Sequence, residues 1–198
     1  MIIAGLTGSI GMGKSTTAAM FIERGVPVHD ADAVVHALYE GEAADKIEAE
    51  FPGTVTNGRV DRSMLAKHVV GKPEAMKKLE SIVHPLVAAK RDEFLATHRK
   101  NEEPLVILDI PLLFETGGDS LVDWIIVVTA SAETQRQRVL SRPDMNPEKF
   151  EAILARQVPD SEKRKRADFL IDTDQGMEAA HHQVQHIIAE LHQAGKSV

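Results

Sequence analysis

Short runs of apolar residues alternate along this chain with longer segments whose apolar positions recur at helical spacing. The apolar runs are continuous, and they lie at residues 2–7, 25–29, 105–108, 124–128 and 169–171. Continuous apolar runs are typical of parallel strands that are covered on both faces. Each crossover between them is long enough to hold a helix, and the last helix is expected at 177–194. The pattern therefore predicts an α/β fold with a doubly wound, parallel, five-stranded sheet.

A phosphate-binding loop follows the first predicted strand. Residues 8 to 15 read Gly-Ser-Ile-Gly-Met-Gly-Lys-Ser, which completes the pattern G-x-x-x-x-G-K-[ST] between a strand and a helix. The glycines let backbone N–H groups converge on phosphate oxygens, and the helix N-terminus adds its free N–H groups. We expect Lys14 to reach the β- and γ-phosphates, the Ser15 hydroxyl to ligate Mg²⁺, and Thr16 to donate to a phosphate.

Two further segments suggest additions to the sheet. Residues from about 33 to 100 have helical patterns and no strand candidate, although Asn57-Gly58 is a turn signal. His84-Pro85 is expected to interrupt a helix there, because the residue before a proline avoids the α region. A polar, proline-containing stretch begins the segment at about 142–165, which we interpret as a lid. We expect one domain over 1–198 with a helical insertion at about 33–100 and this lid.

Three carboxylates lie at the carboxyl ends of predicted strands: Asp30, Asp32 and Asp109. Ligands bind at that edge of a doubly wound sheet, so these carboxylates and the phosphate loop should share one crevice. One carboxylate there can coordinate Mg²⁺, for which we favour Asp109 together with Ser15. Another can take the proton of an acceptor hydroxyl. The residues alone leave open which of the three is the base.

Basic residues and histidines give further candidates. Arg138 and Arg142 are four residues apart and share a helix face, and Arg142 could swing over a triphosphate and neutralise charge on the transferred group. The basic run at 163–166 is interpreted as a solvated helix. His84 either contacts a substrate or satisfies a helix end. The histidines of the last helix are interpreted as a polar face, since no third metal ligand accompanies them.

Composition excludes several classes of protein. The chain has 198 residues, 43% of them hydrophobic, a net charge of −7 and no cysteine. The negative charge argues against a nucleic-acid-binding surface, and no apolar run is long enough for a membrane span. The N-terminus has no basic region ahead of an apolar stretch and no small-residue cleavage site, so no signal peptide is expected. We therefore expect a cytoplasmic protein with small-molecule partners, no nucleic acid and no membrane, as a monomer or weak homo-oligomer.

Taken together, the motifs resemble those of the dephospho-coenzyme A kinase family over nearly the whole chain. The phosphate loop alone is shared with many families, whereas the order of the other segments is much more specific. The matching segments are Gly5–Thr16, Val28-His29-Asp30-Ala31-Asp32, Asn57–Leu65, Leu79–Pro85, Asp109-Ile110-Pro111-Leu112-Leu113-Phe114-Glu115, and Gln135, Arg138, Arg142 and Gln157. One departure follows the last strand, where the family commonly has an Asn and this chain reads Ile171-Asp172-Thr173-Asp174.

The resemblance implies transfer of the ATP γ-phosphate to the 3′-hydroxyl of the ribose of dephospho-coenzyme A, with Mg²⁺. It implies that Asp32 is the general base and that Lys14 and Arg142 act on the phosphates. The implied ATP-binding residues are Ile10, Gly11, Met12, Gly13, Lys14, Ser15 and Thr16, together with Arg138 and Arg142. The implied acceptor-binding residues are Asp32, Arg62, His84, Pro111, Leu112, Leu113 and Glu115.

Two other functions compete with this interpretation. A kinase for another small acceptor, such as a nucleoside monophosphate, has the same order of elements. A nucleotide-dependent switch is the alternative from another class, but the guanine-reading N-K-x-D, the D-x-x-G loop and the L-S-G-G-Q signature do not occur in this chain. Preference among acceptors in an ADP-release assay separates a dephospho-coenzyme A kinase from a nucleoside monophosphate kinase. Binding of ATP without turnover of any acceptor would favour the nucleotide switch.

Overall fold

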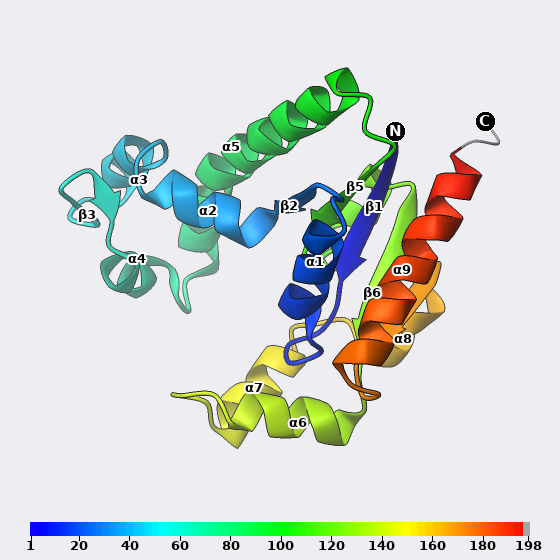
Figure 1. The fold of residues 1–198 in the computed structure, drawn as a ribbon. Helices are drawn as coiled ribbons and strands as arrows, with labels where there is room; N and C mark the ends of the chain where they lie inside the picture. Colours follow the sequence, from blue (N-terminus) through cyan, green and yellow to red (C-terminus); the bar gives the residue numbers. More distant parts are fainter. Residues whose placement is uncertain (196–198) are drawn as a thin grey trace. The chain divides into compact units, whose positions relative to one another are not determined.

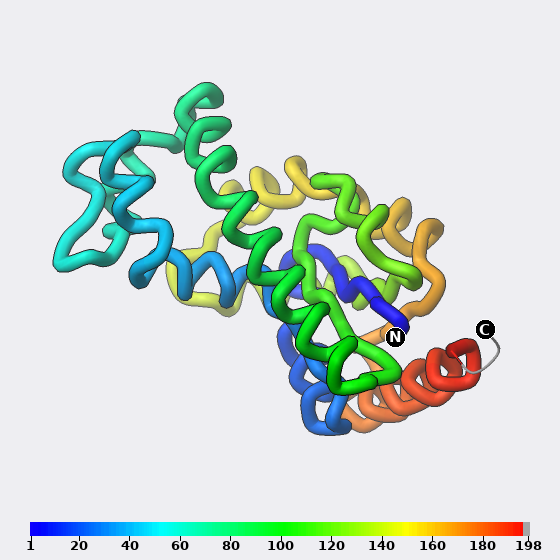
Figure 2. The backbone as a smooth tube through the Cα atoms, turned by 90° about the horizontal axis from the view of Figure 1, so that it is seen from above, coloured from blue at the N-terminus to red at the C-terminus, as the bar shows by residue number. Residues whose placement is uncertain are grey.

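The computed structural model describes residues 1–195, which form two compact units. The first unit contains Met1–His29 and the chain from His98 onward, and the second contains Asp30–Thr97. Figure 1 labels most of the elements of both units, and Figure 2 follows the same chain from above, with the last helix in red. Because the chain divides in this way, each unit is described by itself.

A five-stranded parallel sheet forms the centre of the fold, in the order β2-β5-β1-β6-β7. This confirms the predicted fold class. The strands are β1 (Ile2–Thr7), β2 (Val28–Asp30), β5 (Leu105–Asp109), β6 (Trp124–Thr129) and β7 (Phe169–Asp172). In the register, Leu6 of β1 lies opposite Asp109 of β5 on one side and Ile126 of β6 on the other. The chain adds β2 and β5 on one side of β1 and then β6 and β7 on the other side. The loop after β1 therefore lies at the point where the strand order reverses, and sheets of this kind bind ligands there.

Helices complete the first unit. They are α1 (Lys14–Glu23), α6 (Ala132–Leu140), α7 (Pro147–Leu154), α8 (Asp160–Lys165) and α9 (Met177–Ala194), with a short 3-10 helix at Gly118–Leu121. Figure 1 shows α1 and α9 side by side on the same face of the sheet, and the two helices are in contact.

The two faces of the sheet have separate cores because side chains alternate along each strand. Ile126 and Val128 of β6 join Phe21 of α1 and Val184 of α9 in the larger core. Val127, between them in sequence, packs on the opposite face with Leu113 and Phe114. All three β6 residues are fully buried, which explains why the strand has a continuous apolar sequence.

The second unit is mostly helical and also contains a short hairpin. Its elements are α2 (Ala31–Tyr39), α3 (Ala44–Glu50), β3 (Val55–Thr56), β4 (Arg59–Val60), α4 (Arg62–Val69) and most of α5 (Pro73–Lys100). The expectation that 33–100 contains no strand is therefore wrong. Asn57 and Gly58 both have positive φ, at 53° and 75°, so the predicted Asn-Gly turn joins two paired strands.

The helix α5 differs from the prediction as well. It runs without interruption through Pro85, whereas a break at His84-Pro85 was expected. Proline removes one helical hydrogen bond and disfavours the helix locally. The apolar face of the helix compensates for this, because Leu79 and Val83 lie on one side of Pro85 in the core of the second unit and Leu86 and Val87 pack against that core on the other.

Over the described residues, no helix combines the length and the apolar character that crossing a membrane requires.

Candidate active site

The phosphate loop ends directly at a helix N-terminus. Gly13 is the N-cap of α1, with φ 93° and ψ 14°, and no side chain caps the helix. Gly11 also has positive φ, at 81°. The first N–H groups of a helix have no acceptor within it, so the amides at the start of α1 are available to an anion. Ser15 and Thr16, on the first turn, are exposed.

Two glycines of the loop are required by close packing. A Cβ at Gly8 would lie 2.7 Å from the backbone oxygen of Val128, and one at Gly11 would lie 2.5 Å from Val139 Cγ2. Real Cβ atoms do not approach other atoms so closely, so these positions need glycine for steric reasons. The loop is therefore seated tightly between the end of β6 and the helix α6.

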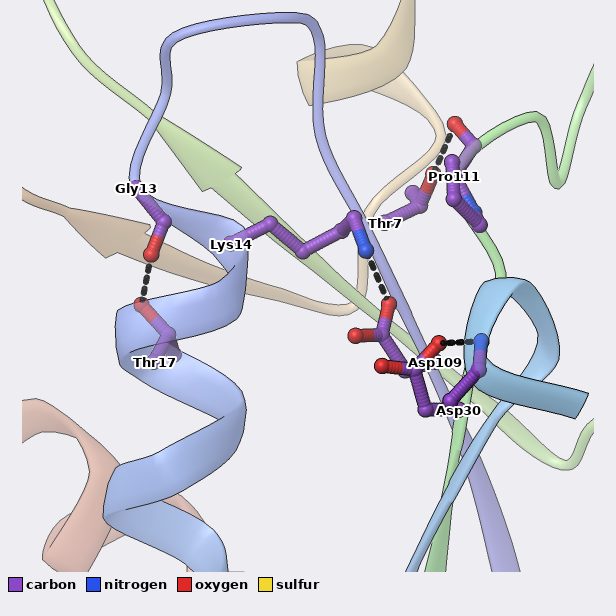
Figure 3. A network of polar contacts seen from close by, with 8 residues as sticks. Thr7, Gly13, Lys14, Thr17, Asp30, Asp109 and Pro111 are labelled. Carbon is purple, nitrogen blue, oxygen red and sulfur yellow. Dashed lines mark hydrogen bonds and ion pairs between the residues drawn. The ribbon is translucent and has the colours of Figure 1, made fainter. Parts of the chain in front are cut away.

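Lys14 extends from the start of α1 to Asp109 at the end of β5, where its Nζ lies 2.5 Å from Asp109 Oδ1 (Figure 3). Asp109 is 2% exposed, and the side chain of Lys14 is 15% exposed. The structure thus brings together the predicted phosphate-binding lysine and the predicted metal-associated carboxylate. In the same view, the Thr7 hydroxyl donates to the carbonyl of Pro111, which ties the residue before the loop to the segment after β5.

Ile10 is held through both of its main-chain groups. Its N–H donates to Gln157 Oε1 at 3.1 Å, and its carbonyl accepts from Gln135 Nε2 at 2.8 Å. Gln135 belongs to α6 and is buried, whereas Gln157 lies between α7 and α8. Both glutamines were noted in the sequence as part of the family pattern, and the structure shows what they contact.

Arg138 contacts the segment that follows β7. Its guanidinium donates to the hydroxyl of Thr173 at 2.7 Å and to the carbonyl of Thr173 at 2.9 Å, and that hydroxyl donates in turn to the carbonyl of Met12. The Asp174 carboxylate accepts from Ser131 N, and this bond holds the pKa of Asp174 below its ordinary value. Arg138 is thus linked to the phosphate loop, and its contact with ATP stays a prediction.

The segment Pro111–Glu115 has both buried and exposed side chains. Leu113 is fully buried with Phe114 in the smaller core, whereas Leu112 is 41% exposed. Glu115 Oε1 accepts from Val158 N at 2.8 Å and lies 3.0 Å from Lys163 Nζ. Burial raises the pKa of Glu115, but the bonds from Lys163 and Val158 outweigh it and hold this pKa below its ordinary value. Contact of these residues with the acceptor stays a prediction.

Other predicted acceptor residues belong to the second unit. Asp30 caps α2 by accepting from Ala33 N at 2.9 Å, a bond drawn in Figure 3, while Asp32 lies exposed in the first turn of that helix. The Arg62 guanidinium lies 5.5 Å from the centre of the Tyr39 ring. Burial raises the pKa of Tyr39 and Arg62 opposes the shift. His84 is exposed on α5. Each side chain is thus accessible to solvent or placed by a local contact.

The expected magnesium site has a suitable set of donors in the first unit. Ser15 supplies a hydroxyl and Asp109 a carboxylate, and both are oxygen ligands of the kind that Mg²⁺ prefers. No group of three or more His, Cys, Asp or Glu side chains among residues 1–195 could hold a metal by itself. In kinases generally, Mg²⁺ is bound by few protein ligands, and phosphates and water complete its coordination.

The sequence did not reveal two residues that stabilise the site, one beside Glu115 and one at the loop. Lys163 was assigned to a solvated basic run, but its side chain is fully buried against Glu115. Four consecutive basic residues obscured the signal, because charge density alone does not show which side chain faces inward. Thr173 lies where the chain departs from the family pattern, and no contact was expected there. Arg142, by contrast, is exposed at the end of α6, where a mobile contact was predicted.

Comparison with known proteins identifies the family. The dephospho-CoA kinase family model matches residues 2–179. The chain belongs to the dephospho-CoA kinase family. A curated dephospho-CoA kinase of Mesorhizobium japonicum is 63% identical over 191 residues, which cover 96% of this chain and 97% of that protein. The family predicted from the motifs, and with it the expectation of a kinase, is confirmed.

Solved structures agree with this assignment to the dephospho-CoA kinase family. A Thermus thermophilus protein of known crystal structure has a TM-score of 0.84 and 38% identity, covering 96% of this chain and 97% of that one. Dephospho-CoA kinase from Campylobacter jejuni has a TM-score of 0.68 and 26% identity, covering 96% of both chains.

Proposed function

We propose that this chain transfers the γ-phosphate of ATP to the 3′-hydroxyl of the ribose of dephospho-coenzyme A, the final step of coenzyme A biosynthesis. The observation that carries the proposal is the pairing of Lys14 with buried Asp109 beside an uncapped helix N-terminus, in a chain of the dephospho-CoA kinase family. This arrangement provides a cation, amides and a carboxylate for a magnesium-bound triphosphate. The proposed location is the cytoplasm.

In the proposed reaction, the acceptor 3′-oxygen bonds to the γ-phosphorus while the bond from that phosphorus to the β–γ bridging oxygen breaks. ADP leaves, and the hydroxyl proton passes to the carboxylate of Asp32 as general base. Lys14 and the free amides at the start of α1 hold the phosphates, and Arg142 closes over the transferred group to offset its developing charge. Ser15 and Asp109 would hold Mg²⁺, which would supply positive charge to the β- and γ-phosphates.

Asp32, Arg62 and His84 are proposed to bind the acceptor, and the segment Pro111–Glu115 is proposed as a further acceptor-binding segment. An acceptor as long as dephospho-coenzyme A needs an extended platform, and the helices of the second unit offer one. The pyrophosphate of the acceptor calls for basic side chains, which Arg62 supplies.

Acceptor preference tests the proposal most directly. In a coupled assay of ADP release, we expect turnover with dephospho-coenzyme A to exceed turnover with AMP, CMP or UMP by at least on the order of 100-fold, as expected for a site built to hydrogen-bond its substrate. Mass spectrometry should find the new phosphate on the ribose 3′-oxygen. Preference for a nucleoside monophosphate would replace the proposed acceptor, and ATP binding without turnover of any acceptor would favour a nucleotide switch.

A further inference from the structure

Gln157 lies outside the set of residues expected to touch substrates, yet it holds the phosphate loop directly. Its Oε1 accepts the N–H of Ile10 at 3.1 Å, while Gln135 donates to the carbonyl of the same residue. A main-chain unit bonded through both of its polar groups has little freedom to rotate. Ile10 is therefore an anchor of the loop, and the amides that follow it, at the start of α1, remain for the phosphates.

Gln157 is itself held by its neighbours in the chain. Val158 donates its N–H to Glu115 at 2.8 Å and packs against the small core of Leu113 and Phe114. The Asp160 carboxylate accepts from the Thr129 hydroxyl at 2.7 Å, at the end of β6. The backbone around Gln157 is thus attached at two points, which fixes the direction from which its carboxamide reaches Ile10.

A buried ion pair underlies the first of these attachments. The ammonium of Lys163 lies 3.0 Å from Glu115 Oε1, the same oxygen that accepts from Val158. The side chain of Lys163 is fully buried, and that of Glu115 is 12% exposed. Removing one charge would leave the other buried without a partner, so the two charges hold each other and the backbone of Val158 in place.

We propose that Gln157 is a positioning residue that sets the phosphate loop for ATP through Ile10, and that the Glu115–Lys163 pair maintains it through Val158. The proposal rests on the proposed function only in taking ATP as the nucleotide. Glu115 ends the segment that begins at Asp109, so one dipeptide, 157–158, connects that segment to the phosphate loop. In-line transfer is sensitive to displacements of about 1 Å, so this connection has a direct effect on rate.

The first test replaces Gln157 with methionine, which has a similar length and no acceptor oxygen. Calorimetry with a non-hydrolysable ATP analogue and Mg²⁺ should show affinity about three- to tenfold weaker, the range expected for one lost hydrogen bond. kcat/KM for ATP should fall by a similar factor while KM for the acceptor stays within about twofold. The matched control is Gln137→Met on α6, an exposed glutamine, which should leave both quantities unchanged.

The second test is a double-mutant cycle. Glu115→Gln/Lys163→Met removes both buried charges together and keeps an oxygen for Val158 N–H, an exchange that buried pairs often tolerate. It should weaken ATP-analogue binding when residue 157 is glutamine and have little further effect when residue 157 is methionine, because both changes act through one path. Additive losses would refute the coupling between the pair and Gln157.

A third measurement does not depend on activity or on nucleotide. Amide hydrogen exchange at Ile10, followed by NMR without ligand, should be at least about tenfold faster in Gln157→Met than in the parent chain, because its acceptor is gone. Unchanged exchange and unchanged affinity would overturn the proposal, and so would tighter binding, which would mean that Gln157 competes with phosphate for the Ile10 amide. None of these binding readouts uses the acceptor, so inactivity toward dephospho-coenzyme A would defeat the proposed function alone.

Discussion

At the scale of single residues, the pairing of Lys14 with Asp109 determines what the phosphate loop presents to a nucleotide. The carboxylate is almost fully buried, so its charge is hardly screened by water, and it holds the ammonium at the end of β5. An arriving triphosphate offers the lysine stronger negative charge and offers the carboxylate a magnesium ion. Before the substrate binds, the charges of Lys14 and Asp109 therefore compensate each other.

Lys14→Met should strongly lower the rate of phosphoryl transfer, while the chain stays folded well enough for its kinetics to be measured. We expect kcat/KM to fall by on the order of 100-fold or more, because a cation on the β- and γ-phosphates is lost. Thermal unfolding should also move to lower temperature, since the buried Asp109 loses its ion pair with Lys14. Steady-state kinetics and calorimetric scans measure the two effects, with Lys165→Met, an exposed lysine, as control. Turnover close to that of the parent chain would remove Lys14 from the mechanism.

Asp32→Asn should lower kcat by on the order of 100-fold while ATP still binds, if Asp32 takes the proton of the acceptor hydroxyl. The matched control is Asp30→Asn. Asp30 caps α2 through a side-chain oxygen that asparagine retains, so this variant should keep both its stability and its kcat. Single-turnover kinetics and ATP titrations distinguish the two. If kcat fell in Asp30→Asn instead, the role of base would pass to Asp30.

At the scale of elements, the loop and its neighbours show which parts of the site a sequence can predict. The strand, the glycine loop and the helix were predicted correctly, because the apolar run of β1, the glycine motif and the helical pattern of α1 are all local in the sequence. The contacts that hold the loop were not predicted, because Thr173 reaches Met12 from 161 residues away in the chain and Gln157 reaches Ile10 from 147 residues away. The β3–β4 hairpin was missed although Asn57-Gly58 signalled it, because its strands have only two residues each.

Gly8→Ala tests the close approach of the loop to β6. The new Cβ would lie 2.7 Å from the carbonyl oxygen of Val128, a backbone atom that moves only with the strand. We expect a loss of about 1–3 kcal/mol in the free energy of unfolding, as for other overpacked sites, and a melting temperature several degrees lower. Chemical denaturation measures the change. Gly41→Ala is the control, because a Cβ there meets no atom within 4 Å. Equal stability of the two variants would contradict the packing described for β6.

Acid should reveal the buried pair that α8 forms with the end of the 109–115 segment. The pKa of Glu115 is lowered in the folded chain, so the pair stabilises the fold above the ordinary glutamate pKa, and this contribution is lost as pH falls through the lowered value. Below that value the carboxyl of Glu115 is neutral, and the buried side chain of Lys163 loses its ion-pair partner. Urea unfolding at several pH values should show a steeper decline of stability below about pH 4 than in Glu115→Gln/Lys163→Met. Parallel declines in the two proteins would show that the pair makes no such contribution.

At the scale of the whole molecule, the chain divides into two compact units, and the expected organisation as one domain with a helical insertion and a lid stays a prediction. The expected insertion at 33–100 overlaps the second unit, Asp30–Thr97, because a long stretch without apolar strand runs cannot extend a parallel sheet. What the sequence could not provide is the internal course of that unit. Pro85 was expected to end a helix, and only the apolar residues on either side of it, buried in a shared core, explain why α5 continues.

Arg62→Ala tests whether the second unit binds the acceptor. The guanidinium of Arg62 is placed by the Tyr39 ring, and a cation there can pair with the pyrophosphate of dephospho-coenzyme A. We expect KM for dephospho-coenzyme A to rise by about 10-fold or more, the loss typical of a charged hydrogen bond, while KM for ATP stays unchanged. Arg91→Ala, which removes an arginine paired with Asp92 on α5, is the matched control. Amide hydrogen exchange, measured with each ligand in turn, locates the residues that bind it. The acceptor should slow exchange of amides within 30–97, and ATP should slow exchange of those within 8–16. An Arg62 variant with altered KM for ATP alone, or acceptor protection confined to the first unit, would place the acceptor elsewhere.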